Sequence, residues 1–200
     1  YWVPRQFSNP NNVRAHYQTT GPELWAQTGG QLDAFVVTQG TGGTLTGVGR
    51  YLRERNPQVR IFAAEPAECP VLSRRQWGPH SIEGIGDGFV PPNLDLSLLD
   101  GVVTVTSEEA VGMARRLARE EGIFAGISSG ANLVAVGKLA RALPELESIA
   151  TIINDNGLRY FSTLMFEVHK ELEVPARDHT LDVYSLAQLD RYQSRWLIID

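Results

Sequence analysis

Residues 34–47 read Ala34-Phe-Val-Val-Thr-Gln-Gly-Thr-Gly-Gly-Thr-Leu-Thr-Gly47, an apolar run, a glycine-rich turn and the beginning of a helical pattern. A continuous apolar run is typical of a strand that a parallel sheet covers on both faces. Glycines leave the backbone N–H groups of the turn uncovered, and a helix N-terminus adds partial positive charge. The stretch therefore predicts a strand, a turn and a helix that together cradle a phosphate group.

The rest of the chain continues the alternation of strands and helices. We expect strands at 33–38, 59–64, 102–106 and 148–154, and helices at about 21–28, 44–54, 107–118, 131–143 and 159–172. A second glycine-serine turn at 122–130 precedes the fourth of these helices, and Ser107 is the expected cap of the third. This order predicts an α/β fold with a mostly parallel sheet and helices on both faces. Residues 1–20 read as an extended lead-in, 21–172 as the phosphate-binding α/β domain and 173–200 as a C-terminal tail.

Composition excludes several classes of function. The net charge of −5 offers no general attraction to nucleic acid, and no segment is apolar for the length that a membrane span requires. The single cysteine, Cys69, allows no intrachain disulfide, which favours a cytoplasmic location. The four histidines show no metal-ligand spacing, so we expect them to be structural or surface residues and expect no metal site.

The residues alone leave three hypotheses open for the function of the glycine turn. It lacks the Gly-Lys-Ser/Thr of a P-loop, and Leu45 occupies the third glycine position of the dinucleotide fingerprint. Glu65, at the end of the next strand, keeps a dinucleotide site open because it is placed like a ribose-binding acid. A turn that needs glycines only for packing is the second reading, although Thr41 and Thr44 add hydroxyl donors that packing does not need. The third is a phosphate held without a lysine in the loop, for which pyridoxal phosphate is the best candidate.

At this point the sequence resembles a known family. The turn 40–44 is similar to the phosphate loop of the cysteine synthase (O-acetylserine sulfhydrylase) and cystathionine β-synthase family, and the likeness is collinear over roughly residues 7–166. The motifs that carry it include Phe7-Ser-Asn-Pro10, Thr19-Thr-Gly-Pro-Glu23, Gly84-Ile-Gly-Asp-Gly-Phe89, Gly126-Ile-Ser-Ser-Gly130 and Arg159-Tyr160.

The resemblance implies most of the larger, C-terminal domain of a fold type II pyridoxal-phosphate enzyme. It implies a transferase or lyase of amino-acid biosynthesis that replaces the leaving group of an O-activated serine with a nucleophile. The residues that it assigns to the cofactor are Gly40, Thr41, Gly42, Gly43, Thr44 and Asn156, and those that it assigns to the small amino-acid substrate are Gly84, Gly86 and Asp87.

The resemblance also implies that the Schiff-base lysine lies before Tyr1. The only lysines are Lys138 and Lys170, and both are expected to be solvated helix residues. We therefore expect no catalytic residue in this chain, inactivity of the chain alone, and a partner chain or segment that carries the N-terminal lysine domain, in a dimer or a heteromeric split enzyme.

Two features leave the function open. Asn156 departs from the family pattern, because it stands where the family has a hydroxyl that faces the pyridine nitrogen, and it is either a ligand of that nitrogen or a turn residue. The second feature is the apolar end 196–199. Together they motivate the alternative of a catalytically silent partner or regulatory subunit, and a nucleotide-binding module is a third hypothesis.

Overall fold

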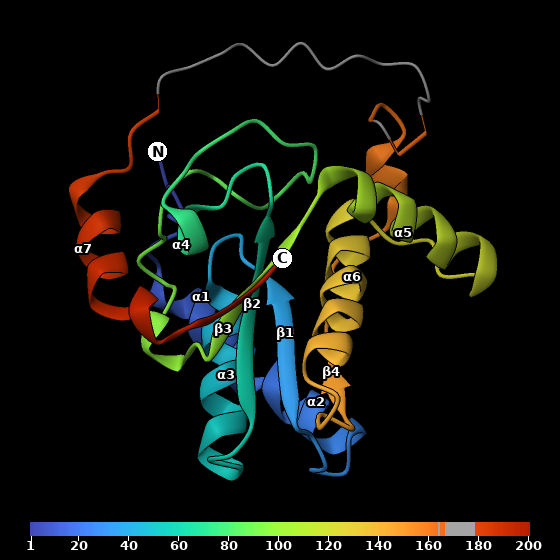
Figure 1. The fold of residues 1–200 in the computed structure, drawn as a ribbon, viewed down its shortest axis with the longest axis horizontal. Coiled ribbons are helices and arrows are strands. Elements are labelled where there is room, and N and C mark those ends of the chain that lie inside the picture. Colours follow the sequence, from blue (N-terminus) through green and yellow to red (C-terminus); the bar gives the residue numbers. More distant parts are fainter. Residues whose placement is uncertain (164, 167–178) are drawn as a thin grey trace.

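The computed structural model describes residues 1–163, 165–166 and 179–200, and its centre is a five-stranded parallel sheet (Figure 1). The strands lie in the order β4-β1-β2-β3-β5. Their bounds are Ala34–Thr38 for β1, Arg60–Pro66 for β2, Gly101–Val105 for β3, Ile149–Ala150 for β4 and Leu197–Ile199 for β5. The predicted α/β fold with a parallel sheet is confirmed.

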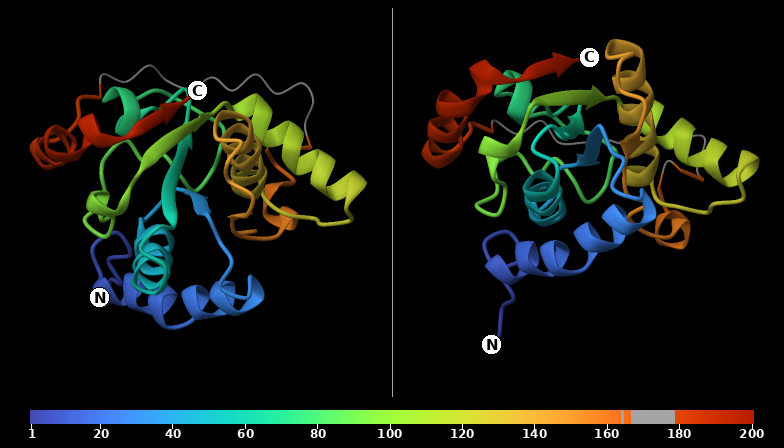
Figure 2. Two further views of the ribbon diagram at one scale, coloured as in Figure 1. Left: turned by 60° about the horizontal axis from the view of Figure 1, so that its bottom comes forward. Right: turned by 90° about the horizontal axis from the view of Figure 1, so that it is seen from below.

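Helices cover both faces of the sheet, as Figure 2 shows. On one face, α3 (Gly43–Arg55) packs with α1 (Pro10–Gln18) and α2 (Thr20–Gln27), and α7 (Val183–Tyr192) adds Leu189 to the same core. On the other face lie α5 (Ser107–Glu120) and α6 (Ile127–Ala142). The side chains of β1 alternate between these layers, because Phe35 and Val37 join the first core while Ala34 and Val36 join the second. The short elements are α4 (Val71–Arg74), η1 (Leu96–Leu98), η2 (Gly157–Tyr160) and η3 (Gln193–Arg195).

The strand order creates a switch point beside β1. The chain runs from β1 to β2 on one side, whereas β4 pairs with β1 on the other side. Crossover connections on either side of such a point leave a crevice outside the carboxyl ends of the two strands, where open α/β sheets bind ligands. The glycine turn follows β1 directly, so the topology places it at this crevice.

The expected extended lead-in is wrong, because residues 10–18 form α1. Asn9 caps that helix by accepting a hydrogen bond from the Asn11 N–H, and Pro10 occupies its first turn. The helix docks closely on α3 at Gly47, where an added Cβ would lie 2.7 Å from the Cβ of His16. A small residue at that position therefore lets α1 approach, and the first 20 residues belong to the domain.

The expected tail is also part of the domain. Its end forms β5, which pairs with β3, and its helix α7 packs into the core through Leu189. Trp196 is buried in the same core, and the Ser185 hydroxyl accepts a hydrogen bond of 2.9 Å from the Val90 N–H. The apolar end thus completes the sheet edge and is not an exposed docking segment.

Three boundaries differ from the expected ones for local reasons. Thr106, not Ser107, caps α5, because its hydroxyl and the Glu109 side chain form a reciprocal capping box. The second glycine-serine turn ends at Gly126, and residues 127–130 already belong to α6. The predicted strand 148–154 pairs with β1 only at two residues, and η2 with a turn replaces the beginning of the predicted helix 159–172. Residues 164 and 167–172 of that helix lie outside the described residues.

Candidate functional site

A cavity of about 400 Å³ opens at the switch point. One wall is the glycine turn after β1, and the opposite wall consists of Ile152, Asn154 and Asp155 after β4, with Tyr160 of η2. Because the two walls follow neighbouring parallel strands, residues more than 100 positions apart meet across one space. The sequence motif and the topology therefore point to the same site.

The glycine turn presents backbone N–H groups to this cavity. Gly42 adopts φ 81° and is the N-cap of α3, so the chain turns sharply from the strand into the helix. Within the described part of the chain, the amides of Gly40, Thr41, Gly42 and Thr44 donate to no acceptor. Unpaired amides at a helix N-terminus form an anion site, and the predicted phosphate cradle has that geometry.

The glycines of the turn are required by neighbours as well as by conformation. A Cβ on Gly42 would lie 2.7 Å from the Cβ of Leu94, and a Cβ on Gly43 would overlap Oδ1 of Asn12. Asn12 belongs to α1, so the helix that the sequence did not predict packs directly against the turn. Gly43 itself does not line the cavity, whereas Gly40, Thr41, Gly42 and Thr44 do.

The two threonine hydroxyls of the turn are held in different ways. Thr41 Oγ1 accepts hydrogen bonds from Asn12 Nδ2 at 2.9 Å and from the Gly43 N–H at 3.3 Å, so its own proton remains available for an anion. Thr44 Oγ1 lies 3.1 Å from Nε2 of His16, whose Nδ1 lies 2.9 Å from Thr20 Oγ1. His16 lines the cavity, and burial lowers its pKa. His16 was not among the predicted site residues, because residues 1–20 were expected to be an extended lead-in and not the helix α1.

The opposite wall differs from the expectation at one residue. Asn156 is exposed, accepts the Leu158 N–H as the cap of η2 and does not line the cavity. Its neighbour Asp155 lines the cavity instead, and its Oδ2 accepts a hydrogen bond of 2.6 Å from the Tyr160 hydroxyl. The structure therefore offers a carboxylate where the sequence predicted an amide.

A buried asparagine on α6 ties the two walls together. Asn132 Oδ1 accepts the Thr38 N–H at 2.7 Å, and Asn132 Nδ2 donates to the Ile152 carbonyl at 2.7 Å. Its side chain is fully buried, and the bond to the Thr38 N–H is shielded from water. Asn132 thus links β1 to the segment after β4, beyond the two residue pairs of the β1–β4 ladder.

The predicted substrate residues separate into two groups. Gly84 lines the cavity and closes against the turn, since a Cβ on Gly40 would lie 2.7 Å from the Gly84 carbonyl oxygen. Gly86 is buried beneath it, where its carbonyl accepts a hydrogen bond from Cys69 Sγ at 3.4 Å. Asp87 is exposed and does not line the cavity. Its role in substrate binding stays a prediction.

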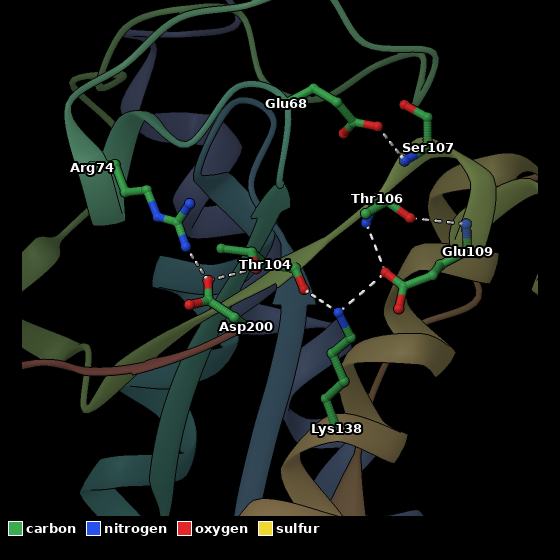
Figure 3. A network of polar contacts seen from close by, with 8 residues as sticks. All are labelled: Glu68, Arg74, Thr104, Thr106, Ser107, Glu109, Lys138 and Asp200. Atoms are coloured by element: carbon green, nitrogen blue, oxygen red, sulfur yellow. Dashed lines mark hydrogen bonds and ion pairs between the residues drawn. The ribbon is translucent and has the colours of Figure 1, made fainter.

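Lys138 is not the solvated lysine that the sequence suggested. Its side chain is 13% exposed, and Nζ donates to the Thr104 carbonyl at 2.9 Å and to Glu109 Oε2 at 3.1 Å (Figure 3). The network in Figure 3 continues through Thr106 of the capping box, so the lysine fastens α6 to the beginning of α5. It does not line the cavity, and Lys170 lies outside the described residues.

Both carboxylate oxygens of Glu65 make structural hydrogen bonds. The residue therefore no longer supports the hypothesis of a dinucleotide site with a ribose-binding acid. It is 2% exposed, and its two carboxylate oxygens accept the N–H groups of Leu72 and Ser73 at 2.7 and 2.9 Å. Burial raises its pKa to about 7. The residue therefore anchors the start of the loop after β2 and does not face the cavity.

Residues 1–163, 165–166 and 179–200 also bear on two further kinds of site. No helix there is long and apolar enough to cross a membrane. No group of three or more His, Cys, Asp and Glu residues there has a metal-binding arrangement.

Comparisons with known proteins agree with this geometry. The family model described as "Pyridoxal-phosphate dependent enzyme" matches residues 1–155. The chain is 52% identical to cysteine synthase 3 of Caenorhabditis elegans over 80% of its length and 48% of that protein, and 46% identical to cysteine synthase A of Escherichia coli over 86% and 57%. It thus spans about half the length of these curated relatives.

A solved structure gives the same result. The crystal structure of an O-ureido-L-serine synthase matches with a TM-score of 0.80 at 43% identity, over 86% of this chain and 55% of that one. The chain therefore belongs to the family of pyridoxal-phosphate-dependent enzymes, and its cofactor is pyridoxal phosphate.

Proposed function

We propose that this chain is the phosphate-binding part of a β-replacement enzyme of the cysteine synthase type, acting on an O-activated serine and a nucleophile. We further propose that the Schiff-base lysine comes from a separate chain or segment. The observation that carries the proposal is the glycine turn, which lines a cavity of about 400 Å³ and whose amides at Gly40, Thr41, Gly42 and Thr44 donate to no acceptor among the described residues. The names of its relatives, cysteine synthase and O-ureido-L-serine synthase, support the substrate class.

The residues present fit pyridoxal phosphate at both ends. The amides of the turn and the Thr41 hydroxyl donate to an anion, which suits a phosphate. On the opposite wall, one buried carboxylate oxygen of Asp155 has no partner among the described residues. When bound, pyridoxal phosphate supplies an electron sink for negative charge that develops on an amino acid.

The chain's own residues contribute binding and orientation. The turn fixes the phosphate, and the contacts of His16 with Thr44 and Thr20 fix the hydroxyl beside it. Asn132 holds the two walls at a constant separation. Lys138 is engaged with Glu109 and a carbonyl, so the chain's described lysine has no role in the cavity.

The proposal is tested with three ligands that differ in one group each. This chain alone should bind pyridoxal phosphate and 4′-deoxypyridoxine phosphate, which lacks the aldehyde, with equal affinity, because no lysine reacts with the aldehyde. It should bind pyridoxal, which lacks the phosphate, at least tenfold more weakly, since the contacts of the turn are charge-assisted. Isothermal titration measures all three affinities.

Borohydride treatment of the pyridoxal phosphate sample, followed by peptide mass spectrometry, tests the lysine claim. No phosphopyridoxyl group is expected on Lys138 or Lys170. A modified lysine would place the reactive end within this chain and overturn that claim. Equal binding of pyridoxal and pyridoxal phosphate would overturn the role of the glycine turn.

The alternative of a catalytically silent subunit loses the two features that motivated it. Asn156 lies outside the cavity wall, and the apolar end 196–199 forms β5 with Trp196 buried. No other observation in the described residues favours that function, so we retain the enzymatic proposal.

A further inference from the structure

We propose that His179 is a positioning residue for the cavity at the switch point. The C-terminal segment 179–200 fastens the loop 83–90, and His179 does so by donating a hydrogen bond to the Gly88 carbonyl. The inference rests on the proposed function in one respect, because it takes pyridoxal phosphate as the ligand whose affinity depends on this loop. It adds a residue outside the cavity that controls how tightly the cavity binds.

The loop 83–90 forms part of the cavity but belongs to no helix or strand. Its residues 83–85 line the cavity. Gly84, Gly86 and Gly88 adopt φ values of 86°, 68° and 83°, a backbone conformation that other residues rarely take. Glycine loses more conformational freedom on folding than any other residue, so contacts with other segments must hold such a loop in place.

The first argument is the contact at the end of the loop. Nε2 of His179 lies 2.9 Å from the Gly88 carbonyl oxygen. A carbonyl only accepts, so Nε2 carries the proton and donates. The His179 ring also packs on Trp77, with the ring centroids 5.1 Å apart. Gly88 is buried against both rings, since a Cβ there would overlap Trp77 and lie 2.9 Å from Nε2 of His179. The missing side chain therefore lets the C-terminal segment reach the backbone of the loop.

The second argument is that the same segment holds the loop again two residues later. The Val90 N–H donates to the Ser185 hydroxyl oxygen at 2.9 Å. That hydroxyl donates in turn to Asp182 Oδ2 at 3.1 Å, so its proton points away from Val90. Ser185 is fully buried, which shields the bond to the loop from water. The loop thus gives one acceptor and one donor to the C-terminal segment.

The third argument is that the C-terminal segment is itself anchored. Arg75 donates to Asp190 at 2.6 Å and to Gln193 at 2.7 Å. The Gln193 amide donates to the carbonyls of Leu72 and Ser73 at 2.8 and 2.7 Å. Arg75 adopts φ 56°, which is uncommon for a residue other than glycine and persists where the surroundings determine it. The segment is therefore fixed at one end of the long loop after β2 and in turn fixes the other end.

The fourth argument is that the loop touches the glycine turn. The Gly86 N–H donates to the Gln39 carbonyl at 3.3 Å, and a Cβ on Gly40 would lie 2.7 Å from the Gly84 carbonyl oxygen. A loop that leaves this position opens the cavity beside the proposed phosphate site. Protein in which the loop is displaced for part of the time binds its ligand with an affinity reduced to the fraction that remains competent.

The first test is hydrogen exchange of the ligand-free full chain, followed by mass spectrometry of peptides. His179→Ala should speed exchange in the loop 83–90 by about three- to tenfold, the range expected for the loss of one hydrogen bond, and should leave β1 unchanged. His179→Gln should restore slow exchange, because the glutamine Nε2 can donate to the same carbonyl. Val183→Ala is the control, since Val183 lies on the same segment and is 85% exposed.

The second test is isothermal titration of the same proteins with pyridoxal phosphate. His179→Ala should bind about three- to tenfold more weakly than wild type, whereas His179→Gln and Val183→Ala should bind like wild type. A rescue by glutamine distinguishes the hydrogen bond from a general packing role of the histidine ring.

Several outcomes would overturn the inference. One is unchanged loop exchange in His179→Ala, and another is faster exchange throughout β1 as well, which would mean a general loss of stability. Failure of His179→Gln to recover, or unchanged affinity in a variant with a loosened loop, would equally exclude a positioning role. Failure of wild-type protein to bind pyridoxal phosphate would instead overturn the proposed function, and the exchange data would still decide whether His179 holds the loop.

Discussion

The two walls of the cavity differ in what their atoms contribute. The wall after β1 acts through backbone amides, which the glycines of the turn expose. The wall after β4 acts through side chains, Asp155 and Tyr160, whose positions depend on α6. A site built from backbone can be read from a local motif, whereas a site built from side chains depends on which of several adjacent residues points inward. Of the five residues predicted for the first wall, all but Gly43 line the cavity, whereas on the second wall Asp155 lines it in place of the predicted Asn156.

The largest effect is expected from breaking the link between the walls. Asn132→Ala removes the partner of the buried Thr38 N–H and of the carbonyl of half-buried Ile152, and should lower the free energy of unfolding by about 4 kcal/mol. Urea unfolding measures it. The control is Leu133→Ala, at the next and partly exposed position of α6. It should lower the free energy of unfolding by less than Asn132→Ala does. Equal losses in the two variants would mean that the asparagine does not hold the walls.

A smaller effect is expected from damage to the backbone wall alone. Gly42→Ala forces a side chain into φ 81° and places its Cβ 2.7 Å from Leu94, so stability should fall by about 3 kcal/mol. Binding of pyridoxal phosphate should weaken because the amides of the turn shift.

The matched control for this variant is Gly112→Ala. Gly112 lies on exposed α5 with open space around its Cα, so the same change should raise stability by about 0.5–1 kcal/mol. If Gly42→Ala were as stable as wild type and bound pyridoxal phosphate equally well, the account of the glycine wall would fail.

The last effect is confined to a range of pH and concerns the carboxyl end of β2, which belongs to neither wall. Because burial raises the pKa of Glu65 from 4.5 to about 7, the folded state keeps a proton that the unfolded state releases above pH 4.5. This contribution to stability is complete below pH 4.5 and is lost as pH rises to about 7, a decrease of about 3 kcal/mol.

Urea unfolding of wild type and Glu65→Gln between pH 4.5 and 8 isolates this effect. His16, whose lowered pKa acts in the opposite direction, is common to both proteins and cancels in the comparison. The variant should lack the decrease and should bind pyridoxal phosphate as wild type does. A large loss of ligand affinity would show that Glu65 belongs to the site after all.

Much of the fold followed from local sequence. Continuous apolar runs predicted the buried strands β1, β2 and β3, and the helical pattern after the turn predicted α3 within one residue at each end. The errors have physical causes. Asn9 and Pro10 begin a helix, but the polar composition of the segment did not predict one. The strand β5 has only three residues and is stable because it pairs with the edge of β3.

The sequence by itself determined the glycine turn and the phosphate that it suits, because a run of glycines and threonines between a strand and a helix exposes amides whatever surrounds it. Only the tertiary structure decided that Asp155 faces the cavity, that Lys138 is bound elsewhere and that His16 takes part. Those roles depend on distances between residues far apart in the chain, which helix packing and strand order set. A local sequence motif does not specify these distances.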